Sequence, residues 1–331
     1  MLKTLLAAAL AGVTLAAPAL AEDFPERELL GVVMWGAGGA TDTVARAVNP
    51  AAEEALGKPI VVLNKSGGAG AISTAYVNAA PADGYTFLYG AENPQLHPVM
   101  GVSKLDYSSF YPVNILGRGV AVIVVPEGSK YQTMDELLKD IAENPGAVKM
   151  GSTGPGGLPS TVAALIANSA PFEVTAIPFG GEGPGLTAML SGEVDFMPSG
   201  ISAAAEQIKA GTMRALAVVN PEPVEILPDV PAITDALPDM SPYLPWGPFY
   251  GVFVRGETPD DVKAVLEEAF KTAAESETFT TLMKNRGNVI MNISGAEAED
   301  FLKKWQQVTA YALKDTGAAK VDPESLGIAR P

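Results

Sequence analysis

The 331-residue sequence carries a net charge of −16, contains one histidine and has no cysteine. The missing cysteines exclude cysteine nucleophiles, thiolate metal sites and disulfides, and a single histidine excludes a histidine-rich zinc site. An acidic chain is also a poor partner for nucleic acids and for anionic membrane surfaces. Because a single hydrophobic core stops growing near about 250–300 residues, this length favours two lobes.

The first 21 residues have the three parts of a secretory signal peptide. Lys3 supplies the positive charge, Leu5 to Ala17 form the apolar stretch, and Ala19-Leu20-Ala21 is a small-x-small cleavage site. The apolar part is shorter than the roughly 20 residues of a membrane-spanning helix, and no later stretch is apolar enough to cross a bilayer. The sequence therefore predicts an exported, periplasmic protein that starts at Glu22, has a net charge of about −17 and offers no cysteine for a lipid anchor.

The stretch from Val32 to Leu56 predicts a strand, a glycine loop and a helix in direct succession. The apolar run ends in Trp35-Gly36-Ala37-Gly38-Gly39, and Thr41 and Asp42 then open a helical pattern. Such a loop aims unpaired N–H groups and the positive end of the helix dipole at one point, which suits an anion. An ordinary βα turn with glycines for tight packing explains the same residues, and the glycine spacing matches neither nucleotide-binding fingerprint. Pro50 predicts a kink or an early end of this helix.

Strands and helices continue to alternate up to residue 89, which predicts a parallel sheet with helices on both faces. The predicted segments are a strand over 58–64, a glycine loop over 66–70, a helix over 71–80 and a strand over 85–89. A loop that contains Asn93 follows.

Two further glycine loops follow strands in the middle of the chain. A predicted strand over 149–151 leads into the loop 152–161 and a helix over 161–168, and a strand over 174–179 leads into the loop 180–185 and a helical turn over 186–190. We interpret Glu182 in the last of these loops as a solvated charge, not a general base. The remaining predicted segments are strands over 120–125, 191–197, 213–219 and 249–254, helices over 134–141, 258–276, 279–285 and 295–316, a surface connection over 220–245 and an irregular end over 317–331.

The apolar strands over 120–125 and 249–254 predict two crossings between two α/β lobes. A segment inserted between the crossings would fold as its own lobe, while the flanking parts combine into the other. The predicted lobes are residues 22–122 together with 248–331, and residues 123–247. Glycine loops from both lobes would then line a cleft between hinged lobes, which is a common geometry of preformed binding sites.

Several motifs of the chain resemble those of the periplasmic solute-binding proteins of tripartite tricarboxylate transporters, often called Bug proteins. The family patterns resemble apolar-Pro-aromatic-x-Pro-Gly-Gly-x-x-Asp-x-x-Ala-Arg, then Leu-Gly-x-Pro-Val-Val-Val-x-Asn-x-x-Gly-Ala-Gly-Gly, then Pro-x-Asp-Gly-Tyr-Thr-aliphatic, and last Pro-Tyr/Phe-x-Gly-x-x-Pro followed by Gly-x-Val-Asp. In this sequence they correspond to Val33–Arg46, Leu56–Gly70, Pro81–Leu88, Pro178–Pro184 and Gly192–Asp195. The resemblance covers essentially the whole chain after the predicted signal peptide.

The resemblance implies a two-lobed type II periplasmic-binding fold that closes on a small organic carboxylate: a di- or tricarboxylate, or an aromatic or amino-acid carboxylate. It implies delivery of this ligand to the membrane components of a tripartite tricarboxylate-type transporter, without catalysis, cofactor or metal, and we expect a monomer. The residues implied to line the cleft are Trp35, Ala37, Gly38, Gly39, Thr41, Asp42 and Asn93 in the first lobe, and Ser152, Thr153, Gly156, Gly157, Ser160, Gly180, Gly181 and Glu182 in the second.

The chain departs from the family pattern at positions that bear on the ligand. Met34, Gly36 and Ala37 replace prolines of the first loop, Ser160 stands where the family has a histidine, and Gly180 replaces a residue that is often polar or charged. These departures leave the identity of the ligand open.

Backbone N–H groups of the glycine loops, with the hydroxyls of Thr41, Ser152 and Thr153, are expected to hold the carboxylate, and waters to bridge the remainder. Trp35 would either lie against the body of the ligand or cap the strand end inside the core. We expect Asp42 to cap the helix and Arg46 to pair with a nearby carboxylate instead of reaching the ligand.

An exported hydrolase and a ligand sensor are the alternatives. A Ser-His-Asp triad would have to use His97, the only histidine, which precedes Pro98 in a loop, and no G-x-S-x-G motif is present. We therefore expect a packed or surface role for His97. A sensor that presents its closed form to a membrane receptor would use the same cleft, so the sequence does not separate sensing from transport.

Overall fold

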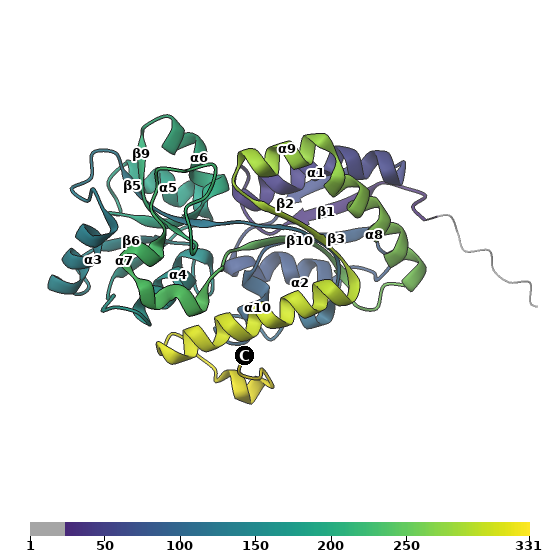
Figure 1. Ribbon diagram of the computed structural model, residues 1–331. Helices are drawn as coiled ribbons and strands as arrows, with labels where there is room; N and C mark the ends of the chain where they lie inside the picture. Colours follow the sequence, from purple (N-terminus) through teal and green to yellow (C-terminus); the bar gives the residue numbers. More distant parts are fainter. Residues whose placement is uncertain (1–23) are drawn as a thin grey trace, which may run out of the picture.

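The computed structural model describes residues 24–331, so the predicted signal peptide over 1–21 lies outside the described residues. Two α/β lobes lie side by side, and two extended segments of the chain cross between them (Figure 1). The predicted two-lobed α/β fold with a hinge of two crossing strands is confirmed. None of the helices in residues 24–331 is both long enough and apolar enough to cross a membrane.

A six-stranded mixed sheet forms the first lobe. Its strand order is β11 (Val289–Ile293), β4 (Phe110–Arg118), β10 (Phe249–Arg255), β3 (Thr86–Gly90), β1 (Leu29–Val33) and β2 (Ile60–Asn64). Only β1, β2 and β3 run parallel, as the alternation of strands and helices predicts. β10 is antiparallel to both β3 and β4, so the six-stranded sheet as a whole is mixed.

Helices cover both faces of this sheet (Figure 1). On one face lie α1 (Ala40–Leu56), α8 (Asp260–Glu275) and α9 (Glu277–Asn285), and on the other lie α2 (Ala71–Ala79) and α10 (Gly295–Asp315). The alternation of side chains along β3 follows this division, because Phe87 and Tyr89 pack toward α8 while Leu88 between them packs on the opposite face. Both helical layers are thus held by fully buried apolar side chains.

The second lobe contains two small sheets. β5 (Ala121–Pro126) lies between β8 (Met197–Gly200) and β9 (Met213–Val219), antiparallel to both, and β6 (Lys149–Ser152) pairs in parallel with β7 (Thr175–Pro178). The helices of this lobe are α3 (Met134–Glu143), α4 (Leu158–Ala167), α5 (Glu182–Leu190), α6 (Ile201–Lys209) and α7 (Ile233–Ala236). Short 3₁₀ helices complete the described chain: η1 (Gly68–Gly70), η2 (Asn93–Leu96), η3 (Tyr107–Ser109), η4 (Pro238–Tyr243) and η5 (Pro323–Leu326).

The two crossings touch each other at the hinge. The chain leaves the first sheet after Arg118 and enters the second at Ala121. Between them the Gly119 N–H donates to the Pro248 carbonyl oxygen over 2.8 Å. A Cβ atom on Gly247 would lie 2.0 Å from the carbonyl oxygen of Gly119, so glycine at this position allows the two backbones to approach.

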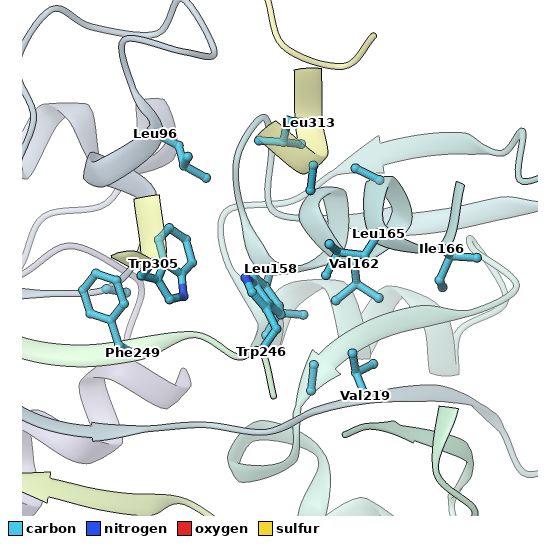
Figure 2. Packing of buried hydrophobic residues seen from close by; sticks show 14 of the residues in the cluster. Leu96, Leu158, Val162, Leu165, Ile166, Val219, Trp246, Phe249, Trp305 and Leu313 are labelled. Atoms are coloured by element: carbon cyan, nitrogen blue, oxygen red, sulfur yellow. The ribbon is translucent and has the colours of Figure 1, made fainter. Parts of the chain in front are cut away.

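An apolar cluster continues from one lobe into the other behind this hinge. Trp305 of α10 packs edge-on against Phe249 of β10, with ring centroids 5.3 Å apart, and Trp246 lies between this pair and Leu158 of α4 (Figure 2). The indole N–H of Trp305 donates to the Gly247 carbonyl oxygen over 3.0 Å, and that of Trp246 to the Thr309 hydroxyl over 3.2 Å. The last helix thereby fastens the second crossing and supports both lobes.

Several local predictions differ from the structure. α1 runs through Pro50 without ending there. Pro50 has no N–H, so the carbonyl oxygen of Arg46 lacks its intrahelical donor. Both residues lie on the exposed side of the helix, where water can replace this donor. The strand expected over 191–197 starts only at Met197. The segment 220–245, expected on the surface, contains α7 and η4 and buries Ile233 and Met240 completely.

Candidate functional site

A cavity lies between the lobes beside the hinge. It encloses ≈ 480 Å³ of empty space, part of which is open to solvent. The space open to the centre of a water-sized sphere is only ≈ 30 Å³, so the cavity is narrow in this structure. The wall consists of Trp35, Gly36, Gly39, Ala40, Thr41, Ala91, Glu92, Pro248 and Tyr250 from the first lobe and hinge, and Thr153, Leu158, Gly181, Glu182, Gly183 and Pro184 from the second lobe.

The N-termini of α1 and α5 form opposite walls of the cavity. The first intrahelical bond of α1 runs from the Thr43 N–H to the Gly39 carbonyl oxygen, and that of α5 from the Gly185 N–H to the Gly181 carbonyl oxygen. The N–H groups that precede these bonds have no acceptor within their own helix. Together with the positive ends of two helix dipoles, they make this cavity suitable for a carboxylate.

Hydroxyl groups add two donors beside these helix ends. Thr41 at the start of α1 and Thr153 after β6 both line the cavity, and only 4% and 7% of their surfaces are exposed. Trp35 also lines the cavity and packs against the hydrophobic cluster behind it, so its contact with the body of a ligand stays a prediction.

In the outer part of the first glycine loop, the carboxylate of Asp42 binds the backbone, so this part of the loop is not free to bind a ligand. Asp42 accepts hydrogen bonds from the Gly38 N–H at 2.9 Å, from Arg46 Nε at 3.0 Å and from Asn64 Nδ2 at 2.8 Å. Burial alone would raise the pKa of Asp42, but these hydrogen bonds outweigh it and hold the pKa below its usual value. Asp42 therefore fixes the start of α1 from its third position and does not line the cavity. Ala37 and Gly38 are exposed and do not line it either.

Two carboxyl groups from opposite lobes line the cavity. Glu92 follows β3 and is only 4% exposed, while Glu182 is the first residue of α5 and is partly buried. Glu182 Oε1 accepts hydrogen bonds from the Gly200 N–H at 2.6 Å and the Ser199 hydroxyl at 3.1 Å. The prediction that Glu182 is a solvated loop charge is therefore wrong: the charge is turned inward because α5 begins at this residue, four residues earlier than the helical periodicity indicates.

Burial raises the pKa of both carboxyl groups. It raises the pKa of Glu92 from an ordinary value of 4.5 to about 8, to which the negative charge of Glu182 contributes, while N–H groups of Glu92 and Leu158 act in the opposite direction. Burial also raises the pKa of Glu182, against the hydrogen bonds from Gly200 and Ser199. Because Glu92 and Glu182 lie on the same narrow cavity, either protonation or a positively charged partner would stabilise them.

Much of the loop 152–161 binds to itself and not to the cavity. The Ser160 hydroxyl donates to the Gly154 carbonyl oxygen at 2.8 Å and lies 3.0 Å from the Ser152 hydroxyl, which accepts from the Gly154 N–H at 3.1 Å. A Cβ atom on Gly157 would lie 2.2 Å from Thr153 Oγ1, so Gly157 shapes the wall from behind. Gly156 packs against Met100 and Leu96. Of the residues implied in this loop, the structure places only Thr153 on the cavity.

Asn93 and Gly180 lie close to the cavity without lining it. Asn93 is 1% exposed, and neither its Oδ1 nor its Nδ2 has a partner. Its Nδ2 would lie 3.2 Å from a Cβ atom on Gly157, which places it next to the Thr153 wall. Gly180 faces the other lobe, since a Cβ atom on Gly36 would lie 3.8 Å from its carbonyl oxygen.

The sequence reasoning missed several wall residues. Glu92 and Ala91 follow the end of a central strand, which is where ligand sites of α/β sheets lie, and this position was an available signal. Pro248 and Tyr250 belong to the second crossing, and only the contact between the two crossings brings them to the cavity. The missed wall residues are Gly36, Ala40, Ala91, Glu92, Leu158, Gly183, Pro184, Pro248 and Tyr250.

His97, which a Ser-His-Asp triad would have to use, lies away from the cavity. His97 is 1% exposed, its ring nitrogens lie 2.9 and 3.3 Å from the carbonyl oxygens of Ala69 and Leu105, and it does not line the cavity. Residues 24–331 contain no group of three or more His, Cys, Asp or Glu side chains that could hold a metal ion. His97 therefore has the packed role that its loop position allows.

Two hinged α/β lobes around a cavity lined by helix N-termini define a solute-binding protein of the periplasmic type. The model of the tripartite tricarboxylate transporter family receptor matches residues 44–311 of the chain. The chain belongs to this family of periplasmic substrate-binding receptors, which confirms the family resemblance of its motifs. The family is one of binding proteins and not of enzymes.

Relatives and solved structures agree with this assignment. A UPF0065 protein from the tcbD-tcbE intergenic region of Pseudomonas sp. strain P51 is 30% identical over 298 residues, which are 86% of each chain. The structure of the periplasmic binding protein BugD is 25% identical, with a TM-score of 0.82, and the match covers 89% of this chain and 99% of that one. MatC from Rhodopseudomonas palustris, solved with bound malate, is 25% identical, with a TM-score of 0.78, and the match covers 86% of this chain and all of the other.

Proposed function

We propose that this protein captures a small organic carboxylate in the interlobe cavity and delivers it to the membrane components of a tripartite tricarboxylate transporter. The observation that carries the proposal is the meeting of the α1 and α5 N-termini at one cavity whose wall has no Lys, Arg or His. With no cation available, the N–H groups of these helix ends and the hydroxyls of Thr41 and Thr153 are the donors for the ligand's carboxylate. The malate bound to MatC supports the same chemical class of ligand.

One ligand can contact all of these donors only while the two lobes lie close together. α1 belongs to the first lobe and α5 to the second, so a carboxylate between them links the lobes directly. A ligand bound in this way stabilises the closed form, which is the form that a membrane partner can recognise. We expect binding without turnover, because the family is one of binding proteins.

Isothermal titration calorimetry with di-, tri-, aromatic and amino-acid carboxylates tests the binding step. Hydrogen bonds to charged groups contribute about 1.5–3 kcal/mol, so Thr41→Val should weaken binding of the best ligand about tenfold or more. Thr43→Val is the matched control, because Thr43 lies in the same turn of α1 but does not line the cavity. Equal affinities for both variants would contradict the proposed site.

Uptake measurements test delivery and separate transport from sensing. Deletion of this gene and deletion of the partner membrane genes should each abolish uptake of the ligand that calorimetry identifies. Uptake that persists in both strains, with loss of a transcriptional response only when this gene is deleted, would contradict transport and indicate a sensor. Size-exclusion chromatography with light scattering tests the expected monomer.

A further inference from the structure

A second cavity lies at the hinge and shares no wall residue with the interlobe cavity. The space open to the centre of a water-sized sphere is ≈ 590 Å³ there, so a small hydrated ion has room to enter. The charged residues of its wall are three basic side chains, Arg118, Lys209 and Lys284, and one acidic side chain, Glu225. This local excess of positive charge stands out in a chain whose net charge is −16.

The three basic residues come from three elements in both lobes. Arg118 is the last residue of β4, where the first crossing begins, and Lys284 lies in the last turn of α9. Lys209 is the last residue of α6 in the second lobe. The lobes touch beside the cavity, because Arg286 Nη1 at the end of α9 donates to the Ser202 carbonyl oxygen of α6 over 2.5 Å (Figure 1). This contact between the lobes holds the three charges at one cavity.

Arg118 lacks a counter-charge in the part of the chain that the structure describes. Its Nη1 is buried and has no hydrogen bond. Burial lowers the pKa of Arg118, and neither a hydrogen bond nor an acidic neighbour acts in the opposite direction. None of the ion pairs within residues 24–331 includes Arg118, Lys209 or Lys284. A buried guanidinium without a partner is unfavourable, so this one calls for an anion from outside the chain.

Asn288 is an independent sign of a missing partner at the same wall. It lines the cavity, is only 7% exposed, and its Oδ1 has no hydrogen bond. Its Nδ2 has only the sulfur of Met283 as a partner, at 3.5 Å, and a thioether is a weak acceptor. Val289, the next residue, pairs with Arg118 between β11 and β4, so Asn288 and Arg118 lie close together. Native structures seldom leave buried polar atoms without partners, and a polar ligand at this wall would supply them.

We propose that the hinge cavity is a second anion site, which takes a small oxyanion with two or more negative charges, such as phosphate. Lys209 and Lys284 each lie in the last turn of a helix, where a positive charge also stabilises the helix dipole. That role does not account for Arg118, which ends a strand. Because Lys209 belongs to one lobe and Lys284 to the other, a bound oxyanion links the two lobes at the spacing seen in this structure.

Thermal unfolding and isothermal titration calorimetry with inorganic phosphate test the proposal. Phosphate should raise the melting temperature of the protein, because a ligand that binds only the folded form stabilises it. Potassium chloride at the same ionic strength should not, since it screens charges without filling the site. A rise of the same size with chloride, or no rise at millimolar phosphate, would overturn the proposal.

Substitutions at the wall connect the binding of phosphate to this cavity. Arg118→Met keeps the apolar stem and removes the guanidinium, so it should weaken phosphate binding by about tenfold or more. Lys209→Gln and Lys284→Gln change exposed side chains and should each weaken binding by about threefold, while Glu225→Gln should strengthen it. Lys271→Gln is the matched control, because Lys271 is an exposed lysine of the first lobe that does not line the cavity.

Two further comparisons separate this site from other places where phosphate could bind. Thr41→Val changes the interlobe cavity and should bind phosphate like the wild type. Phosphate binding that Thr41→Val removes and Arg118→Met keeps would overturn the proposal. If Arg118→Met does not fold, the two lysine variants decide, and unchanged binding in both of them would overturn it as well.

Sedimentation with phosphatidylglycerol vesicles distinguishes a free oxyanion from a lipid headgroup. The acidic chain should stay in the supernatant, because the net charge of −16 repels an anionic membrane surface. Co-sedimentation that Lys209→Gln and Lys284→Gln abolish would overturn the assignment to a free ion and indicate a lipid headgroup. The capture of a carboxylate in the interlobe cavity does not depend on any of these results.

Discussion

Glu92 should make closure of the ligand-free protein depend on pH. Its pKa is about 8 in the described structure, whose narrow interlobe cavity we take as the closed form, whereas that of a hydrated glutamate is 4.5. A group whose pKa is raised on closure binds a proton more tightly in the closed form than in an open or unfolded form. The closed form therefore has its full stability at pH values below about 4.5, loses stability as the pH rises, and reaches a constant value above about 8.

The size of this effect follows from the two pKa values. One pH unit corresponds to about 1.4 kcal/mol, so the full loss between 4.5 and about 8 is roughly 5 kcal/mol, and roughly 3.5 kcal/mol of it is already lost at pH 7. Glu182, Tyr107 and Tyr250 face the same carboxyl group, and each is disfavoured in its charged form, so none of them offsets the loss. Opening of the lobes hydrates Glu92, so we expect opening to precede unfolding.

Small-angle X-ray scattering and urea unfolding of the ligand-free protein test this prediction. Between pH 5 and pH 8.5 the radius of gyration of the wild type should rise, while that of Glu92→Gln should rise clearly less, because only Glu182 then keeps a raised pKa at the cavity. The free energy of unfolding of Glu92→Gln relative to the wild type should grow by one to several kcal/mol over the same range. Glu193→Gln corrects for the general loss of one surface charge. Parallel pH curves for the wild type and Glu92→Gln would refute the reasoning.

The remaining predictions concern the hinge and the first loop. Gly247→Ala places a Cβ atom 2.0 Å from the Gly119 carbonyl oxygen and should lower the free energy of unfolding by about 1–3 kcal/mol in urea titrations, whereas Gly128→Ala, which meets no atom within 4 Å, should not. Trp305→Phe keeps an aromatic ring but removes the donor to Gly247, so it should lower the same free energy by about 1–2 kcal/mol. Asp42→Asn should lower it by about 1–3 kcal/mol at pH 7. Because the pKa of Asp42 is lowered by folding, this difference should disappear as the pH falls below about 4, and a difference that persists in acid would contradict a role for the charge.

Periodicity in the sequence predicts the elements whose residues pack on one regular surface. β9 has the predicted bounds, 213–219, because it is a continuous apolar run, and β10, α8 and α10 differ from prediction by one or two residues. β4 and β11 were not predicted because each contains an irregularity that interrupts the pattern. Pro112 of β4 sits at a register shift against β10, and Asn292 of β11 has a positive φ of 51° beside another shift.

The candidate site was only partly predictable, for a different reason. The glycine loops mark helix N-termini correctly. The sequence does not show, however, at which of these N-termini the protein's own side chains accept the free N–H groups. Asp42 takes the Gly38 N–H, Glu92 interacts with the N–H at the start of α4, and Glu182 takes the N–H of Gly200, which precedes α6. The donors that remain at the cavity are those of α1 and α5, and this division depends on long-range contacts that local pattern does not contain.

The overall charge of the protein bears on which acid can enter this cavity. A chain with a net charge of −16 repels a dianion at long range, and an acidic cavity wall adds to this repulsion at short range. An amino acid with a single carboxylate carries no net charge and approaches without this repulsion, whereas one with two carboxylates keeps a net negative charge and is still repelled. The association rate of a net-neutral acid such as 4-aminobutyrate should therefore change little with salt, while that of a dicarboxylate should rise as salt screens the repulsion. Stopped-flow measurements of the intrinsic tryptophan fluorescence at low and high ionic strength make this comparison directly, because Trp35 lines the cavity. A rate for the dicarboxylate that falls steeply with salt would show that a positive field attracts it, and the description of an acidic cavity wall formed by Glu92 and Glu182 would then be wrong.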